Sequence, residues 1–232
     1  MSRLCHDREG RFLKPSIQVF ENSELLVETL AGECASTLLE GGTAVFGGGV
    51  VPLAVCGALA SRPNLPWRMI QIFPADEAFL PKGHPERNET RLRMLLSRRT
   101  CLLQSFPTGL DPDRAAREMQ KYVRRVLPFD MVVLEMGPDG SVGALVPGST
   151  VLDSPELVAV VEGKSRNSPE RLVLTPRALS ASERVVICAT GDEASEPLKA
   201  VFRGDDLPPS MLRSLQPVAI YADRKAASGL ES

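Results

Sequence analysis

One stretch constrains the fold of this chain more than any other, and it reads FDMVVLEMGPDGSVGALVPGS over residues 129–149. Its residues 131–136 form an apolar run with a single charge, Glu135, and a Gly-Pro-Asp-Gly turn follows. An apolar run that ends in a glycine-rich turn is typical of a buried parallel strand at the carboxyl edge of a sheet. Ligands of open α/β folds bind at that edge, so residues 137–149 are the first candidates for a site. A turn without function is the alternative.

Similar apolar runs alternate with helical periodicity along most of the chain. The expected strands are 17–20, 43–46, 68–73, 131–136, 157–161, 171–174, 184–189 and 218–221. The expected helices are 23–40, 53–59, 89–96, 111–126, 193–202 and 208–215. This alternation predicts an α/β fold of three layers, Rossmann-like, with a mostly parallel sheet and helices on both faces. We expect a single domain over residues 1–232, with a possible small inserted subdomain around 147–170.

Composition excludes several classes of protein. Of the 232 residues, 43% are hydrophobic and 24% charged, with a formal net charge of -2, as in an ordinary soluble globule. The basic residues are scattered, which argues against a nucleic-acid partner. No apolar stretch has the length of a membrane span, and the first residues lack the apolar core of a secretion signal. The sequence therefore predicts no membrane partner.

The cysteines and histidines limit the chemistry further. The chain has five cysteines without a C-x-x-C pair, which favours reduced thiols and a cytoplasmic location. The only imidazoles are His6 and His84, which lie far apart in the sequence. We therefore expect no metal site, and without a G-x-G-x-x-G motif we expect no nucleotide cofactor.

Two further strand ends carry candidate residues. Gly47, Gly48 and Gly49 follow one strand and precede a helix, an arrangement that can present backbone N–H groups to an anion; a tight turn without a ligand explains the pattern equally well. Asp76 and Glu77 follow the next strand, where paired carboxylates can serve as acid and base; a solvated loop pair is the alternative.

Taken together, the motifs resemble the 6-phosphogluconolactonase family, which belongs with the glucosamine-6-phosphate isomerases. The chain carries GGGVVP, WRMIQIFPADEA, RN, the 129–149 segment, RLVLTPRAL, ATG, LPPS and IYAD in the family's order, over roughly residues 17 to 228. The resemblance implies a hydrolase that opens 6-phosphogluconolactone to 6-phosphogluconate in the pentose phosphate pathway. It implies direct attack by water without a cofactor, and a small sugar phosphate or lactone as the partner.

The candidate site residues come from the motifs that match the family and from nearby residues that could replace its missing groups. The residues expected to bind the substrate are Gly47, Gly48, Gly49, Asp76, Arg87, Asn88, Gly137, Gly140 and Arg171. The residues expected at the catalytic position are Ser141, Asp139, Glu77 and His84. Ser141 stands where the family has its catalytic histidine. His84 is a candidate replacement base, and Asp139 or Glu77 can activate water if desolvation raises its pKa.

Four departures from the family pattern bear on activity. Ala78 replaces the arginine after the acidic pair, Ala194 a lysine, and Val50 and Val51 the hydroxyl residues of the glycine loop. Each lost charge-assisted bond to a phosphate forfeits about 1.5 to 3 kcal/mol. A catalytically inactive or repurposed relative is therefore the alternative, one that binds a sugar phosphate, another small ligand or a protein. A third hypothesis is a hydrolase that acts on a less anionic lactone or ester. We expect the protein to be a monomer or a homodimer.

Overall fold

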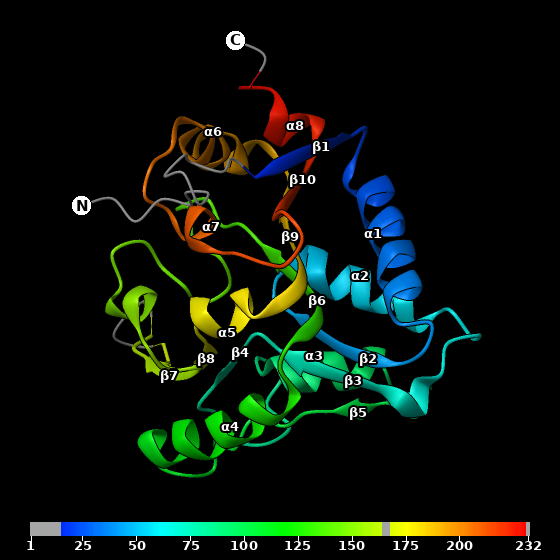
Figure 1. The fold of residues 1–232 in the computed structure, drawn as a ribbon, viewed down its shortest axis with the longest axis vertical. Helices are drawn as coiled ribbons and strands as arrows, with labels where there is room; N and C mark the ends of the chain where they lie inside the picture. Colours follow the sequence, from blue (N-terminus) through cyan, green and yellow to red (C-terminus); the bar gives the residue numbers. More distant parts are fainter. Residues whose placement is uncertain (1–14, 164–167, 231–232) are drawn as a thin grey trace.

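The computed structural model of the chain describes residues 15–163 and 168–230. Seven strands form one sheet in the order β1-β10-β9-β6-β2-β3-β5, and all neighbours in it are parallel. The strands are β1 (Ser16–Phe20), β2 (Gly42–Phe46), β3 (Ile70–Pro74), β5 (Leu102–Leu103), β6 (Phe129–Glu135), β9 (Ser182–Ala189) and β10 (Ala219–Asp223). Figure 1 shows this sheet running through the centre of the molecule. The prediction of a mostly parallel α/β fold is confirmed.

Helices cover both faces of the sheet. The α-helices are α1 (Ser23–Thr37), α2 (Val50–Ala60), α3 (Asn88–Leu95), α4 (Pro112–Val126), α5 (Pro176–Ser180), α6 (Ser195–Arg203), α7 (Pro208–Met211) and α8 (Arg224–Ala227). Single 3-10 turns are η1 (Trp67–Met69), η2 (Thr150–Asp153) and η3 (Asp192–Ala194). One buried cluster joins α1, α2 and α3 to the sheet, and a second joins α4, α5, α6 and α8 to the opposite face. Figure 1 shows α1 and α2 side by side.

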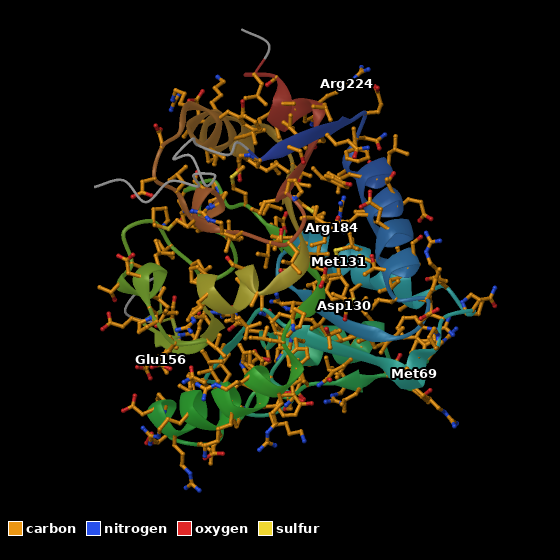
Figure 2. All side chains as sticks on the ribbon, viewed as in Figure 1. Met69, Asp130, Met131, Glu156, Arg184 and Arg224 are labelled. Carbon is orange, nitrogen blue, oxygen red and sulfur yellow. The ribbon has the colours of Figure 1, made fainter. Side chains whose placement is uncertain are left out.

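Strand β6 is buried on both sides, which explains its unbroken apolar sequence. Met131 and Val133 pack into the cluster under α1 and α2, whereas Val132 and Leu134 pack into the cluster on the other face. Successive side chains of a strand point to opposite faces, so a central strand needs apolar residues at every position. Figure 2 shows Met131, beside Asp130, near the centre of the molecule. The carboxylate of Asp130 accepts hydrogen bonds from the backbone N–H and hydroxyl of Thr43 and so ties β6 to β2.

Two expected strands belong to a second, smaller sheet. The strands β4 (Asp76–Ala78), β8 (Arg171–Leu174) and β7 (Val158–Val161) pair antiparallel in the order β4-β8-β7. Residues 76–78, which the sequence analysis placed after the strand 68–73 and in no strand of their own, therefore form a strand. The partner of β4 is about a hundred residues away in the chain, so no local pattern signals the pairing. The inserted segment predicted around 147–170 contributes β7, and its residues 164–167 lie outside the described residues; the division into domains stays a prediction.

The expected helix over 208–215 is wrong in its second half. Helix α7 ends at Met211, and the backbone N–H groups of Leu215 and Gln216 donate to the carbonyls of Ser182 and Glu183. These bonds to the start of β9 require an extended chain, so tertiary pairing overrides the helical pattern. In the described part of the chain, no helix combines the length and the apolar character needed to cross a bilayer.

Candidate functional site

A cavity of about 640 Å³ lies where the parallel strands end. Strands β2 and β6 are neighbours in the sheet, and the chain turns away from them in opposite directions across it, so their carboxyl ends flank a crevice. The predicted site residues that line the cavity are Gly47, Gly48, Gly49, Asp76, Asn88, Gly137, Ser141 and Arg171. Residues from five separate motifs therefore meet at one place. Glu77, His84, Arg87, Asp139 and Gly140 are not among the residues that line it.

The glycine turn leads directly into helix α2, with Gly49 as its N-terminal cap. The first-turn N–H of Val51 does not point at an empty space, because it donates to Oε2 of Glu135 at 3.1 Å. A Cβ atom at Gly49 would lie 2.0 Å from that same oxygen, so only glycine allows the carboxylate to approach. Burial raises the pKa of the half-buried Glu135 carboxyl, and the N–H groups of Val51 and Val50 act against that rise.

Asp76 and Arg171 form an ion pair at the wall of the cavity. Oδ2 of Asp76 lies 2.6 Å from Nε and 2.5 Å from Nη2 of Arg171, and the Asp76 side chain is almost fully buried. The two residues stand on β4 and β8, which pair in the small sheet. The pair carries no net charge, so it attracts an anionic ligand less strongly than an unpaired guanidinium would. Arg171 thus lines the cavity with its Nε and Nη2 donors engaged by Asp76.

Glu77 faces the protein interior, behind the cavity wall. Its carboxylate is fully buried and accepts the backbone N–H groups of Ala78, Asn88 and Glu89 at 2.8–2.9 Å. Desolvation by burial raises the pKa of Glu77, while these bonds and the charge of Arg87 oppose the rise. A carboxylate with its oxygens engaged in this way holds the loop after β4, and its position does not bring it to a substrate.

Arg87 belongs to this interior cluster rather than to the cavity. Its Nε lies 3.5 Å from Glu77, and its Nη2 lies 2.9 Å from Glu89, whose carboxylate also accepts the hydroxyl of Ser105. Burial would raise the pKa of Glu89, but bonds from Ser105 and Arg93 outweigh it and the pKa is lowered. Arg87 is 3% exposed, so the phosphate contact predicted for it requires a rearrangement of this cluster.

Asn88 joins the acidic corner to the glycine turn. Its Nδ2 donates to the backbone carbonyl of Asp76 at 2.7 Å. A Cβ atom at Gly48 would lie 2.1 Å from Oδ1 of Asn88, so the glycine is required for the two loops to meet. Two of the three glycines therefore serve close approach by protein side chains, which is a structural reason for their presence.

The turn after β6 brings a hydroxyl and a carboxylate together. Gly137 N–H donates to the Ser141 carbonyl, and Gly140 adopts a φ of 76°, which closes the turn. The Ser141 hydroxyl and backbone N–H both donate to Oδ1 of Asp139. Ser141 is buried and lines the cavity, whereas Asp139 is exposed beside it. The pair places a base next to a cavity hydroxyl.

His84 lies on the loop between β4 and α3. Its Nδ1 accepts the backbone N–H of Glu86 at 3.2 Å, a local bond that holds the ring against its own loop. Among the residues described as lining the cavity there is no histidine. The role of His84 as a replacement base stays a prediction, and it requires the loop to move.

The positions that depart from the family pattern lie mostly at the cavity. Val50, Ala78 and Ala194 line it, whereas Val51 is buried beneath.

Sequence reasoning missed Glu135 and Arg91, which also line the cavity. The lone charge in an apolar strand was a usable signal for Glu135. Arg91 had none, because it is one of several arginines on a helix; its side chain donates to the carbonyls of Pro85 and Gly48. The described residues contain no cluster of three side chains able to hold a metal.

Comparison with known proteins gives consistent matches. The family described as "Glucosamine-6-phosphate isomerases/6-phosphogluconolactonase" matches residues 21–223. The chain is 33% identical to the 6-phosphogluconolactonase of Pseudomonas aeruginosa, over 73% of this chain and 75% of that protein. It is 26% identical to the 6-phosphogluconolactonase of Mycobacterium tuberculosis, over 95% of this chain and 100% of that protein. The solved 6-phosphogluconolactonase of Thermotoga maritima shares the fold with a TM-score of 0.79 and 24% identity, over 90% and 100%.

Proposed function

Because this chain belongs to the glucosamine-6-phosphate isomerase/6-phosphogluconolactonase family, we propose that it is a sugar-lactone hydrolase of the 6-phosphogluconolactonase type. The observation that carries the proposal is the cavity at the carboxyl ends of β2 and β6, where Gly48, Asp76, Asn88, Ser141 and Arg171 meet. Its volume of about 640 Å³ suits a small cyclic sugar derivative. The names of the relatives support a lactone as the reacting group.

The chemistry assigned to the site is hydrolysis by direct attack of water. Water oxygen adds to the lactone carbonyl carbon while one of its protons passes to a carboxylate. The ring C–O bond then breaks, and the departing oxygen takes up a proton, so that a hydroxy acid results. Asp139 lies outside the described lining, so we assign the contact with the water to Ser141, whose hydroxyl takes the water proton while it passes its own to the Asp139 carboxylate. Neither step needs a cofactor or a metal.

An aspartate in a polar turn is a weaker base than an imidazole, which sets the expected rate. General-base catalysis contributes about 10²- to 10⁴-fold when the base is well matched to the working pH. A carboxylate is matched to neutral pH less well than an imidazole, so the acceleration belongs at the lower end of that range. A cavity that orients the lactone adds to it.

The hydrolase proposal is tested by measuring the rates at which δ-gluconolactone and 6-phosphogluconolactone are hydrolysed in the presence of micromolar protein. Each rate is compared with the spontaneous rate without protein. We expect acceleration of at least one lactone. Asp139→Asn should reduce it about 100-fold or more, because the base is lost. Asp113→Asn, the same change at an exposed position of α4, is the control and should keep the wild-type rate. Equal rates with and without protein for both lactones would rule out the hydrolase.

One observation favours a second candidate, a protein that binds the same ligands without turnover. Ser141 occupies the cavity position for which the family pattern has histidine, and no other imidazole is described in the lining. Ser141→His separates the two functions. If the wild type is silent, the substituted protein should gain measurable lactone hydrolysis. If the wild type accelerates lactone hydrolysis and does so at least as fast as Ser141→His, the non-catalytic function is excluded.

The setting of the activity is part of the proposal. We propose a cytoplasmic location, which the free thiols of Cys34, Cys56, Cys101 and Cys188 support. We also propose a monomer or homodimer, with a small lactone or sugar phosphate as the only partner the cavity requires. Sedimentation velocity distinguishes the two assembly states directly.

A further inference from the structure

The cavity already contains an anion of its own at the place best suited to bind one. Glu135 ends strand β6, and its Oε2 accepts the N–H of Val51 in the first turn of α2. Gly49 offers no side-chain cap to this helix, and no acidic residue stands in its first turn. The Glu135 carboxylate therefore serves as the helix's cap from another strand, and it uses the favourable end of the helix dipole.

A phosphate group brought to this turn would meet that carboxylate. Two anions at one helix N-terminus repel each other, and the Val51 N–H, one of the donors that a phosphate oxygen could use there, is occupied by Glu135. Displacing Glu135 would leave its carboxylate half-buried without this donor. The close fit between Glu135 and Gly49 also leaves no gap for a phosphate oxygen between them.

The remaining charges of the described lining do not compensate. The acidic residues there are Asp76, Glu86, Glu135, Glu162 and Glu193, and the basic ones are Arg91 and Arg171. Arg171 is paired with Asp76 within 2.6 Å. The other basic residue of the described lining is Arg91, whose exposed side chain donates to backbone carbonyls. Its single positive charge is outnumbered by the carboxylates of the lining. A cavity with an excess of one sign repels ligands of that sign.

Neutral and apolar groups make up the rest of the surface. Asn88 and Ser141 offer hydrogen bonds that suit sugar hydroxyls, while Val50, Ala78 and Ala194 offer apolar contact. Such a lining fits an uncharged ring with several hydroxyl groups. It gives a dianionic phosphate ester few favourable contacts.

We propose that Glu135 is a specificity-determining residue which excludes phosphate esters, so that the ligand of this cavity is an uncharged sugar lactone. The identification of the ligand as a lactone rests on the proposed function. The exclusion of phosphate rests on the hydrogen bond between Glu135 and Val51. It predicts that a ligand loses affinity when a phosphate is added, and that removing the Glu135 charge reverses the effect.

The test uses two probes that no hydrolase can open, 1,5-anhydroglucitol and its 6-phosphate, with binding measured by calorimetry. Wild-type protein should bind the unphosphorylated probe about tenfold tighter or more. Glu135→Gln, which keeps the shape and an acceptor for Val51, should shift the ratio of the two affinities toward the phosphate by about tenfold or more. Glu135→Gly, which empties the position, should shift it at least as far.

A matched control separates local from general electrostatics. Glu40→Gln removes the same charge from an exposed residue outside the cavity lining. It should change the ratio by less than about twofold, because exposed charges are screened. Melting temperatures of all variants, compared with wild type, show that the ratios refer to folded protein.

The outcomes are distinct from those of the hydrolase assay. Wild-type protein that binds the phosphorylated probe as tightly as the neutral one, or that binds neither, overturns the proposal; so does an unchanged ratio in folded Glu135→Gln. Preference for the neutral probe without any lactone turnover would uphold the role of Glu135 and end the hydrolase. Faster turnover of 6-phosphogluconolactone than of δ-gluconolactone would support the proposed hydrolase activity and would contradict the exclusion of phosphate esters by Glu135.

Discussion

Two glutamates near the carboxyl edge of the sheet illustrate how the surroundings of one residue type decide its role. Glu77 is fully buried and accepts three backbone N–H groups beside Arg87. Glu135 is half-buried, lines the cavity and accepts an N–H from α2. Burial raises the pKa of both carboxyls. Glu77 therefore acts on the fold, and Glu135 on what enters the cavity.

Glu77→Ala should be among the most damaging substitutions in this chain. It leaves three buried backbone N–H groups without their acceptor and removes the carboxylate 3.5 Å from Nε of Arg87, which keeps its closer pair with Glu89. Removal of one partner from a buried charged pair costs about 3–5 kcal/mol of unfolding free energy. Urea denaturation measures this loss.

The control for that experiment is Glu86→Ala, which removes an exposed glutamate from the same loop. Its unfolding free energy should stay within about 0.5 kcal/mol of wild type. A Glu77→Ala protein as stable as Glu86→Ala would show that the Glu77 bonds contribute nothing net to the fold.

At the scale of elements, helix α1 is joined to strands β9 and β10 by a polar cluster of Glu33, Arg184 and Tyr221 on the face of the sheet that α1 covers. The Tyr221 hydroxyl donates to Glu33 on α1 and accepts from Arg184 on β9, at 2.5 and 2.9 Å. Arg184 also pairs with Glu33, and Figure 2 shows it between the sheet and α1. Burial first, then the bond and charge of Glu33, raise the pKa of Tyr221 to about 12.

This pKa predicts a loss of stability at alkaline pH. The unfolded tyrosine ionises near the ordinary tyrosine pKa of 10.0, whereas the folded one keeps its proton to a pKa of about 12. Between these values the folded state binds more protons, so unfolding free energy falls as pH rises, by roughly 2 kcal/mol in total. Urea unfolding of wild type and Tyr221→Phe from pH 9.5 to 12 measures the difference in slope.

Tyr221→Phe cannot ionise, so its stability should fall less steeply over that window, although it begins lower by about 1 kcal/mol for the lost hydrogen bond. Cys34, whose pKa burial raises to about 12, contributes a similar slope to both proteins. Tyr122→Phe, the same change at the other tyrosine of the chain, serves as control and should retain the wild-type slope. Identical slopes in wild type and Tyr221→Phe would contradict the assignment.

For the whole molecule, ligand binding and folding are coupled because the cavity walls come from both sheets. Residues from β4, β6, β8 and the start of α2 line it, and unfolding separates all of them. A ligand at about 100 times its Kd stabilises the folded state by about 2.7 kcal/mol. In a chain of this size that corresponds to an increase in Tm of roughly 5–10 °C.

We therefore expect saturating 1,5-anhydroglucitol to raise Tm by this amount in a thermal-shift assay. Inorganic phosphate, 6-phosphogluconate and glucose 6-phosphate at equal concentration should each change Tm by less than about 1 °C, because Glu135 opposes their charge. A large shift with 6-phosphogluconate alone would instead indicate a phosphate-binding site of the usual polarity in this cavity.

Much of this architecture was predictable from the sequence, for a definite reason. Strand β6 and the turn at Gly137 follow from an apolar run and a Gly-Pro-Asp-Gly sequence, which are local signals. The end of α7 at Met211 was not predictable, since it depends on backbone bonds from Leu215 to the start of β9. The strand character of residues 76–78 depends on β8, and so was also out of reach.

The candidate site divides in the same way. The motifs at Gly48, Asp76 and Ser141 identified the cavity, because parallel strands end at one edge whatever their order in the chain. The roles of Glu77, Arg87 and Arg171 were not visible, since each role depends on which partner the side chain reaches. Arg171 reaches Asp76 from 95 residues away, and Arg87 turns inward to Glu77 and Glu89.

By itself the sequence determined the alternation of strands and helices, the edge of the sheet where the cavity lies, and the family. Periodicity and turn chemistry act over a few residues, so they are legible in one dimension. Only the tertiary structure decided that Glu135 lies against the N-terminus of α2, 84 residues distant from Val51 in the chain. Contacts of that span arise from the packing of whole elements, and they settle whether a carboxylate caps a helix, pairs with an arginine or faces a ligand.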